Sequence, residues 1–338
     1  MVENQTDDRI EGVTPTPARR APVDAVAPSI HAINVSLPWR TVQPDCAAVR
    51  RGEWDWSRTD KAMRVAEANS LWVVATLTGG PACTSRRPGG HYEPTRKWRD
   101  DWARFAARIA RRYGPGGLVP VLRAVEPWNE PNLDRFTGTA KAYRVLFLRT
   151  DSAIRRGNPR VKTLAGAVAL CCEHSIRWIS RLYADPRMRR RGNRVSVHTY
   201  APDPLTAIQR MARAKNELPN GASLWITEHG WSTCADPDGE PLGKCVSPEE
   251  QAANMWNYFA LVFANAERLH VQAVFWFNGQ DLATRESTAE CPESPKNFYG
   301  LWTNGGESKP VLTAWEYMTA TDLPEQIEPH RILAGCKE

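Results

Sequence analysis

Two glutamates in this sequence stand where apolar segments end, and a pair of such acids could cleave a glycosidic bond. Glu130 lies in the segment Glu126–Asn132, directly after the apolar run Val121–Glu126, and Glu228 follows the run Ser223–Thr227. One carboxylic acid can protonate the leaving oxygen of a glycoside while the other carboxylate attacks the sugar or activates water. The two acids are far apart in the sequence, so this chemistry requires a fold that brings them together.

Short apolar runs alternate with amphipathic helical segments from residue 32 onward. The runs are rich in Val, Ile, Ala and Leu without strict alternation, which is typical of parallel strands buried on both faces. We expect seven such strands, at Ala32–Leu37, Leu71–Leu77, Val121–Glu126, Val161–Val168, Arg194–Thr199, Ser223–Thr227 and Val271–Phe277.

This alternation allows a doubly wound open sheet or a closed barrel. An open dinucleotide-binding sheet calls for a GxGxxG segment after a strand, and the sequence contains none. The sequence therefore predicts an α/β fold of the (β/α)8 TIM-barrel class. Such a barrel places its chemistry at the carboxyl ends of the strands, where Glu130 and Glu228 are expected to face each other.

The first βα unit of this barrel is expected to be abbreviated or irregular. Ile10–Val13 is the only strand candidate before residue 32, and four prolines disfavour a long helix there: Pro15, Pro17, Pro22 and Pro28. A misplaced gene start is the alternative. We expect an irregular segment over residues 1–31, one catalytic barrel domain over 32–320 and a C-terminal tail over 321–338.

The 338 residues carry a net charge of +6, and 42% of them are hydrophobic, which excludes a disordered chain. No apolar stretch is long enough to span a membrane, and the polar N-terminus shows no signal peptide. The basic residues are spread out, and the densest run, Arg187–Arg191, is expected to be a solvated turn. Neither a nucleic acid nor a membrane is therefore expected as a partner.

The eight cysteines form no CxxC pair, so zinc-ribbon spacing is absent and we expect neither a metal nor a cofactor. Most of them lie in predicted loops, which favours disulfides and an oxidising, extracellular location. Cys234 and Cys245 share one loop and are the favoured pair. Eight free thiols in a cytoplasmic protein are the alternative.

The ordered motifs resemble those of retaining glycoside hydrolases of clan A, and most closely those of family 39 and its actinobacterial relatives. The resemblance runs from about Pro38 to Tyr317 and rests on Trp54–Ser57, Trp128–Asn132, Val197–Tyr200, Thr227–Trp231, Val274–Phe277 and Ser308–Pro310. It implies hydrolysis of O-glycosidic bonds by double displacement. In that reaction Glu130 is the implied acid/base and Glu228 the implied nucleophile.

The same resemblance implies roles for neighbouring polar residues. Asn129 is expected to hydrogen-bond the 2-hydroxyl of the sugar, a contact that strengthens in the transition state. His198 and Tyr200 are expected to line the site between the two acids, with Tyr200 orienting Glu228. Glu126 shares the strand face of Glu130, and buried structural pairing is its favoured role.

Three tryptophans follow strand ends and are candidates for sugar platforms. The resemblance implies that Trp276 lies under the sugar ring. Trp39 and Trp231 fit a sugar platform and a core position equally well.

Asn34 stands where relatives usually carry an arginine that keeps the nucleophile ionised. An asparagine can hydrogen-bond Glu228 but supplies no charge, so the pKa of the nucleophile is expected to rise. Two functions therefore remain open. One is a glycosidase acting on β-linked sugars such as xylosides, glucans or arabinose-containing polymers, and the other is a carbohydrate-binding pseudoenzyme. Both predict an oligo- or polysaccharide partner.

Overall fold

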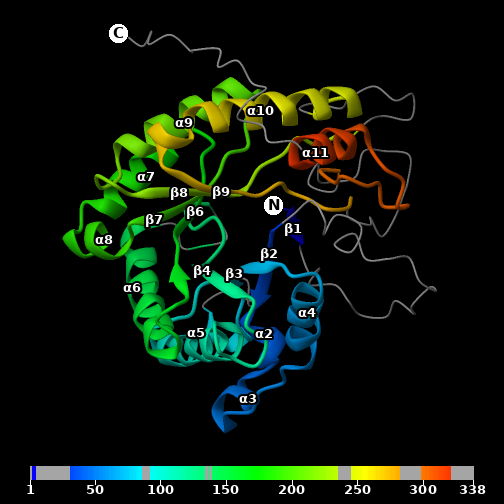
Figure 1. The fold of residues 1–338 in the computed structure, drawn as a ribbon. Helices are drawn as coiled ribbons and strands as arrows, with labels where there is room; N and C mark the ends of the chain where they lie inside the picture. The colour runs from blue at the N-terminus through cyan, green and yellow to red at the C-terminus, as the bar shows by residue number, and fades with distance from the viewer. Residues whose placement is uncertain are drawn as a thin grey trace.

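The computed structural model describes residues 2–4, 31–85, 92–133, 136, 139–234, 245–281 and 298–320. Strands and helices alternate along this part of the chain, and the strands lie inside a layer of helices (Figure 1). These elements form the predicted (β/α)8 barrel.

The described strands pair in parallel, in an order that follows the chain. One sheet contains β1 (Val2–Asn4), β2 (Ala32–Pro38), β3 (Trp72–Thr78), β4 (Leu122–Pro127) and β5 (Lys162–Thr163). The other contains β6 (Ala165–Ala169), β7 (Arg194–His198), β8 (Ser223–Glu228) and β9 (Val271–Val274). The expected strand Val161–Val168 comprises β5 and β6, with Leu164 between them. It therefore joins the two sheets, and the segments occupy eight strand positions.

The first barrel strand lies earlier in the chain than expected. The backbone of β1 pairs with Ile33–Val35 of β2, and β1 has only three residues. The strand candidate Ile10–Val13 lies outside the described residues. Parallel pairing uses backbone groups that nearly every residue carries, so a short polar segment can form a strand without an apolar signature. The abbreviated first strand was predicted, but its position was not.

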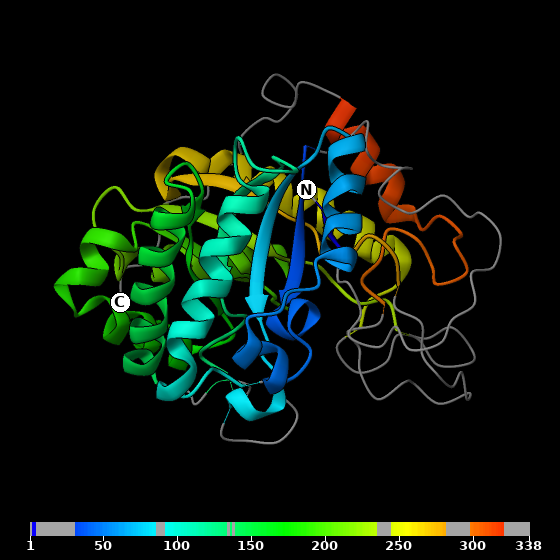
Figure 2. The same cartoon turned by 90° about the horizontal axis from the view of Figure 1, so that it is seen from below.

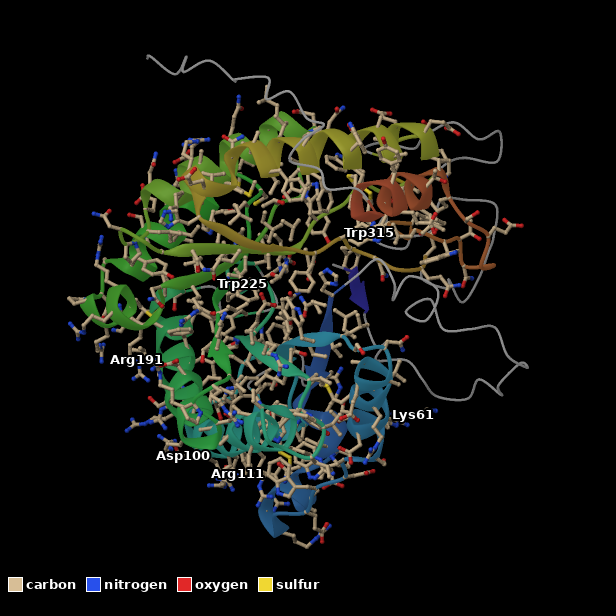
Figure 3. All side chains as sticks on the ribbon, in the orientation of Figure 1. Lys61, Asp100, Arg111, Arg191, Trp225 and Trp315 are labelled. Carbon is tan, nitrogen blue, oxygen red and sulfur yellow. A yellow bond between two sulfur atoms is a disulfide. The ribbon has the colours of Figure 1, made fainter. Side chains whose placement is uncertain are left out.

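Helices cover the outside of the strands. They are α2 (Trp39–Val42), α3 (Cys46–Arg51), α4 (Ser57–Ala68), α5 (Arg99–Tyr113), α6 (Ala140–Gly157), α7 (Glu173–Tyr183), α8 (Pro186–Arg191), α9 (Pro204–Asn216), α10 (Pro248–Leu269) and α11 (Pro310–Ala320), with 3-10 turns at Ala82–Thr84 and Arg96–Trp98. Figure 2 shows α5 and α6 side by side on the outside of the strand layer. In Figure 3 the labelled side chains Lys61, Asp100, Arg111 and Arg191 lie on the outer surface, whereas Trp225 and Trp315 lie inside. Within the described residues, no helix is both long enough and apolar enough to cross a membrane.

The arginine-rich run Arg187–Arg191 is helical, so the prediction of a turn was wrong. Asp185 caps α8 by accepting a hydrogen bond from the backbone of Arg187, and Pro186 occupies the first turn. Both features favour the start of a helix. Asp185 also pairs with Arg144, and Asp151 pairs with Arg191, so part of the basic charge is neutralised.

The barrel interior changes from apolar to polar along the strands. Side chains two positions apart on a strand share one face, and in a barrel one of these faces points inward. A separate apolar cluster contains Ala32, Val74, Ala124, Leu164, Trp225, Ala273 and Phe275. Two residues further along β2, β3 and β4 lie Asn34, Thr76 and Glu126, and all three are buried. A buried polar layer therefore lies directly beneath the carboxyl ends of the strands.

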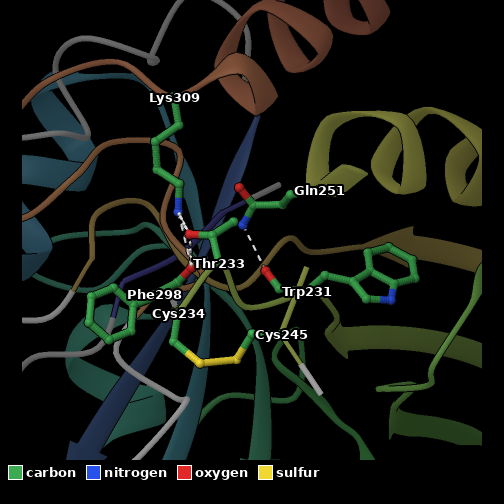
Figure 4. Close-up of a disulfide and its surroundings, with 7 residues drawn as sticks. All are labelled: Trp231, Thr233, Cys234, Cys245, Gln251, Phe298 and Lys309. Atoms are coloured by element: carbon green, nitrogen blue, oxygen red, sulfur yellow. Dashed lines mark hydrogen bonds between the residues drawn. A yellow bond between two sulfur atoms is a disulfide. The ribbon is translucent and has the colours of Figure 1, made fainter. Parts of the chain in front are cut away.

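Among the described residues two disulfides are present: Cys46–Cys83 joins the start of α3 to the 3-10 turn Ala82–Thr84, and Cys234–Cys245 follows β8 (Figure 4 shows the second). The second confirms the predicted pair, and together they show that the alternative of eight free thiols was wrong. Cys171 and Cys172 are free and exposed. Cys291 and Cys336 lie outside the described residues.

Loss of the Cys234–Cys245 disulfide is expected to destabilise the fold measurably. The bond joins residues 11 positions apart, and constraint of an unfolded loop of that size contributes about 3 kcal/mol. Urea unfolding of the Cys234→Ala/Cys245→Ala double variant should show this loss. Cys171→Ser is the matched control, since it leaves both disulfides intact and should change the free energy of unfolding by less than about 0.5 kcal/mol. Equal free energies for the double variant and the parent chain would contradict this prediction.

Candidate active site

Glu130 and Glu228 converge on one imidazole. His198 ends β7, and its Nδ1 atom lies 3.1 Å from Glu130 Oε1 and 3.2 Å from Glu228 Oε2. One ligand-type atom from each of the three side chains lies within 4.8 Å of the other two. Glu228 ends β8, the neighbour of β7, whereas Glu130 follows β4. The barrel therefore brings together three residues that the sequence placed in one site.

The loop that carries Glu130 has a strained backbone. Trp128 and Glu130 both have positive φ angles, 96° and 43°, which are uncommon for residues other than glycine. The ring of Trp128 is buried against Trp102, and the backbone N–H of Glu130 donates to the carbonyl of Ala167 at 3.0 Å. Asn129, between the two strained residues, is half-buried. Strain of this kind persists where packing holds the backbone, and it is common at functional sites.

The two acids differ in their surroundings. The side chain of Glu130 is 19% exposed, whereas that of Glu228 is 8% exposed. Burial raises the pKa of Glu228 to about 7, and the charge of Glu130 adds to that rise. Two neighbours lower the pKa of Glu228: the imidazole of His198 and the hydroxyl of Tyr200. The Tyr200 hydroxyl donates to Glu228 Oε2 at 3.0 Å. Tyr200 therefore contacts Glu228, the residue that it was predicted to orient.

The carboxylates around the buried His198 favour its protonated form. Burial alone lowers the pKa of an imidazole, but the negative charges of Glu228, Glu130 and Glu126 outweigh it and raise the pKa of His198 to about 9. The protonated Nδ1 can donate to both acids. The site thus has an internal positive charge between its two carboxylates.

Asn34 lies in the polar layer beneath the acids. Its amide nitrogen donates to the backbone carbonyl of Thr227 at 3.4 Å, and not to the carboxylate of Glu228, which an asparagine could also have reached. The hydroxyl of Thr76 lies 3.0 Å from Asn34 Oδ1 and donates to Glu126 Oε2 at 2.6 Å. Asn34 and Glu126 are therefore linked in one buried hydrogen-bond network, as the structural role predicted for Glu126 requires.

The three candidate platform tryptophans are all buried. Trp276 and Trp39 have no exposed surface, and Trp231 is 4% exposed. Their Nε1 atoms donate to Tyr299 O, Gln43 Oε1 and Pro202 O respectively. A sugar platform needs an accessible ring face. The structure therefore does not support the platform predicted at Trp276, and it places Trp39 and Trp231 in the core.

Tyr299 is a site residue that the sequence did not reveal. Its half-buried ring lies 5.5 Å from the ring of Tyr200 and 5.6 Å from that of Phe277. Burial raises the pKa of Tyr299 to about 12, with a further contribution from the charges of Glu228 and Glu130. The phenol is thus within electrostatic range of both acids and beside the ring of Tyr200. It lies in a loop after β9, and loop residues show no periodicity that would have marked it.

Lys309 holds the segment that carries Tyr299 against the loop after β8 (Figure 4). Its buried ammonium group donates to Phe298 O at 3.0 Å and to Thr233 Oγ1 at 2.8 Å, and it pairs with Asp281. Loss of one partner of a buried ion pair is costly. Lys309, part of the motif Ser308–Pro310, therefore has a positioning role.

The trio of Glu130, His198 and Glu228 also satisfies the spacing of metal ligands. Coordination requires a neutral imidazole. The surrounding carboxylates favour the protonated form of His198, and in that form the trio can transfer protons and stabilise charge.

No protein-family model and no curated protein matches the sequence. Solved structures do match. A family 39 glycoside hydrolase from the gut symbiont Bacteroides cellulosilyticus WH2 has a TM-score of 0.62 and 17% identity, over 88% of this chain and 60% of that one. A monomeric β-xylosidase from Caulobacter crescentus CB15 has a TM-score of 0.63 and 20% identity, over 88% and 64%. The glycoside hydrolase family 53 catalytic domain of Ignisphaera aggregans has a TM-score of 0.60 and 14% identity, over 88% of each chain.

The chain spans less than two thirds of the length of the first two enzymes. All three matches are at low sequence identity and wide coverage of this chain, so they establish its architecture. The protein has the barrel fold that these clan A glycoside hydrolases share.

Proposed function

We propose that this chain is a retaining glycoside hydrolase with Glu130 as acid/base and Glu228 as nucleophile. The observation that carries the proposal is the convergence of the two carboxylates on His198, with the three ligand atoms within 4.8 Å of one another. Retaining enzymes hold their carboxyl groups about 5–5.5 Å apart, whereas inverting enzymes need roughly 6.5–9.5 Å to admit a water molecule. The observed spacing favours retention.

In the first step, Glu228 attacks the anomeric carbon of the sugar and the glycosidic C–O bond breaks. Glu130 gives its proton to the leaving oxygen, and a glycosyl ester forms on Glu228. Tyr200 and His198 hold the ionised Glu228 in place before the attack. Glu130 is the more exposed acid, so it can reach the leaving group.

In the second step, Glu130 takes a proton from water, and the water oxygen attacks the anomeric carbon. The ester bond to Glu228 breaks and the carboxylate is restored. Two inversions give net retention. His198 lies beside both acids in both steps. Its positive charge can therefore stabilise whichever carboxylate is ionised, Glu228 before the attack and Glu130 after it has given up its proton.

The charge of His198 is the reason to favour an enzyme over a carbohydrate-binding pseudoenzyme. Asn34 supplies no cation, but His198 lies 3.2 Å from Glu228 and lowers the pKa of that acid. His198, on a different strand from Asn34, thus offsets part of the rise that burial causes in the pKa of Glu228. A missing arginine on β2 therefore does not by itself imply lost catalysis.

The proposed substrates are β-linked sugars, with xylosides as the first candidates because one similar structure is a β-xylosidase. Arabinose-containing polymers and glucans are the other members of the proposed class. The test is turnover of nitrophenyl β-glycosides and polysaccharides, with proton NMR of the first-formed product. A product that keeps the β configuration supports the proposal. Inversion would contradict the mechanism, and sugar binding without turnover would support the pseudoenzyme.

The Tyr200→Phe variant is expected to move the acidic limb of the kcat/KM profile to higher pH. Glu228 must lose its proton to attack, its pKa is about 7, and the Tyr200 hydroxyl lowers that pKa. Loss of this hydrogen bond should shift the limb upward by roughly one pH unit. Because the acids titrate together, the shift belongs to the coupled site.

Tyr183→Phe is the matched control for this measurement. It removes a buried hydroxyl that donates to Gly192 O at 2.6 Å, on a helix away from the acids. This variant should lose stability without a shift of the pH profile. An unshifted profile for Tyr200→Phe would refute the role assigned to its hydroxyl.

We also propose an oxidising, extracellular location. The two disulfides Cys46–Cys83 and Cys234–Cys245 support it, since such bonds persist mainly outside the reducing cytoplasm. The test is a thiol assay on the protein isolated from its native compartment under alkylating conditions.

A further inference from the structure

Two adjacent cysteines lie between β6 and α7, at the same end of the barrel as the acids. β6 ends at Ala169, Cys172 is the N-cap residue of α7, and both Cys171 and Cys172 are exposed. Their Sγ atoms are 3.1 Å apart. A disulfide bond is about 2.05 Å long, so a movement of roughly 1 Å would close this gap.

We propose that Cys171 and Cys172 are a reversible redox site that closes into a vicinal disulfide by exchange with a small-molecule disulfide. The inference does not rest on the proposed glycosidase activity. It rests on the juxtaposition of two accessible thiols, in a chain whose other described cysteines are all paired in disulfides.

The local surroundings favour Cys172 as the attacking group. The side chain of Cys171 and the backbone N–H groups of His174 and Ser175 lower the pKa of Cys172, whereas burial raises that of Cys171. The thiolate of Cys172 attacks the small disulfide and expels one thiolate. The Cys171 thiol then loses its proton, attacks Cys172 Sγ and expels the second thiolate. Two electrons pass from the cysteine pair to the oxidant, which leaves as two thiols.

The product is an eight-membered ring, and it is strained because the peptide bond between Cys171 and Cys172 holds their Cα atoms close together. Cα atoms of adjacent residues are about 3.8 Å apart, whereas disulfides usually span about 4.4–6.8 Å. Strained and exposed disulfides are the more easily reduced ones. The pair should therefore open at lower reductant concentration than Cys234–Cys245, which makes it reversible while the structural bonds persist.

The pair is connected to the loop of the acid/base candidate. Cys171 Sγ lies 3.3 Å from the buried hydroxyl of Ser175, which donates to Ala169 O at 2.6 Å. Asn132, two residues after Glu130, donates to the same carbonyl and accepts from the N–H of Ala169, both at 3.0 Å. A change at Cys171 thus reaches the loop of Glu130 through the Ser175 hydroxyl, the Ala169 carbonyl and the Asn132 amide.

The test uses the full chain, incubated with oxidised glutathione, alkylated and digested with trypsin. The peptide of residues 163–177 contains both cysteines. We expect it to be lighter by two hydrogens and to carry no alkyl group, and graded dithiothreitol should restore double alkylation before Cys234 becomes reactive.

Cys171→Ser and Cys172→Ser are matched controls, and each should stop at a mixed disulfide with glutathione on the remaining thiol. Two alkyl groups on the parent peptide after oxidation would overturn the proposal. So would two separate glutathione adducts, or a bond from either residue to Cys291 or Cys336.

Discussion

Glu228→Gln is expected to abolish turnover of every substrate that the parent chain hydrolyses. The amide cannot attack the anomeric carbon, and loss of a covalent nucleophile reduces kcat by roughly 10⁴-fold or more. The fold should survive, because glutamine is similar in size and can keep the contact with Tyr200. Initial rates on the best nitrophenyl glycoside, measured with matched circular dichroism spectra, provide the comparison.

A covalent label provides a second readout for Glu228. A deoxyfluoro glycoside with a good leaving group slows hydrolysis of the glycosyl ester, so the ester accumulates on the nucleophile. After reduction and digestion, the peptide of residues 216–244 should carry the sugar in the parent chain and not in the variant. Glu267→Gln, an exposed change near the end of α10, should label and turn over normally. Full activity of Glu228→Gln, or a label elsewhere, would end the nucleophile assignment.

Glu130→Ala is expected to lose activity in a way that depends on the leaving group. Without its proton donor, cleavage of a sugar with a poor leaving group should slow by about 10²–10⁴-fold. A dinitrophenyl glycoside needs no protonation, so its kcat/KM should change little while its kcat falls, because water then lacks its general base. Steady-state kinetics across a series of leaving groups measure both effects.

Azide distinguishes the two acids. In Glu130→Ala the anion can replace water without a general base, so it should restore kcat and give a β-glycosyl azide. In Glu228→Ala it should instead occupy the place of the nucleophile and give the α-glycosyl azide, because only one displacement occurs. Exchanged anomers, with α from Glu130→Ala and β from Glu228→Ala, would show that the two roles are reversed, and the same anomer from both variants would contradict the double displacement.

The apolar runs of the sequence predicted most of the barrel. Seven strands lie close to their expected positions, because a strand buried on both faces is apolar over most of its length. The position of β1 was not predicted, because three residues of mixed polarity show no hydrophobic periodicity. The strand at residues 161–168 has a break at Leu164 and positive φ angles at Gly166 and Ala167 that no hydrophobic pattern encodes.

The sequence predicted the polar residues of the candidate site but not its aromatic residues other than Tyr200. Glu130, Glu228, His198 and Tyr200 were predicted together, and the structure places them in contact. The roles of the tryptophans could not be settled in this way, because one residue type serves the core and a sugar platform. Burial decided against a platform at Trp276. Tyr299 was missed because its nearness to the acids depends on the course of a loop.

By itself the sequence determined that Glu228 ends one strand and that Glu130 follows another, because apolar composition marks a strand and the acids lie where that composition stops. Only the tertiary structure decided the charge of the site. The pKa of His198 depends on three carboxylates and on burial, and these come from strands and loops distant in sequence. It also decided that Cys46 pairs with Cys83 and that Cys171 and Cys172 remain free, because pairing needs Cβ atoms within about 3.5–4.5 Å and residues distant in sequence reach that distance only in the fold.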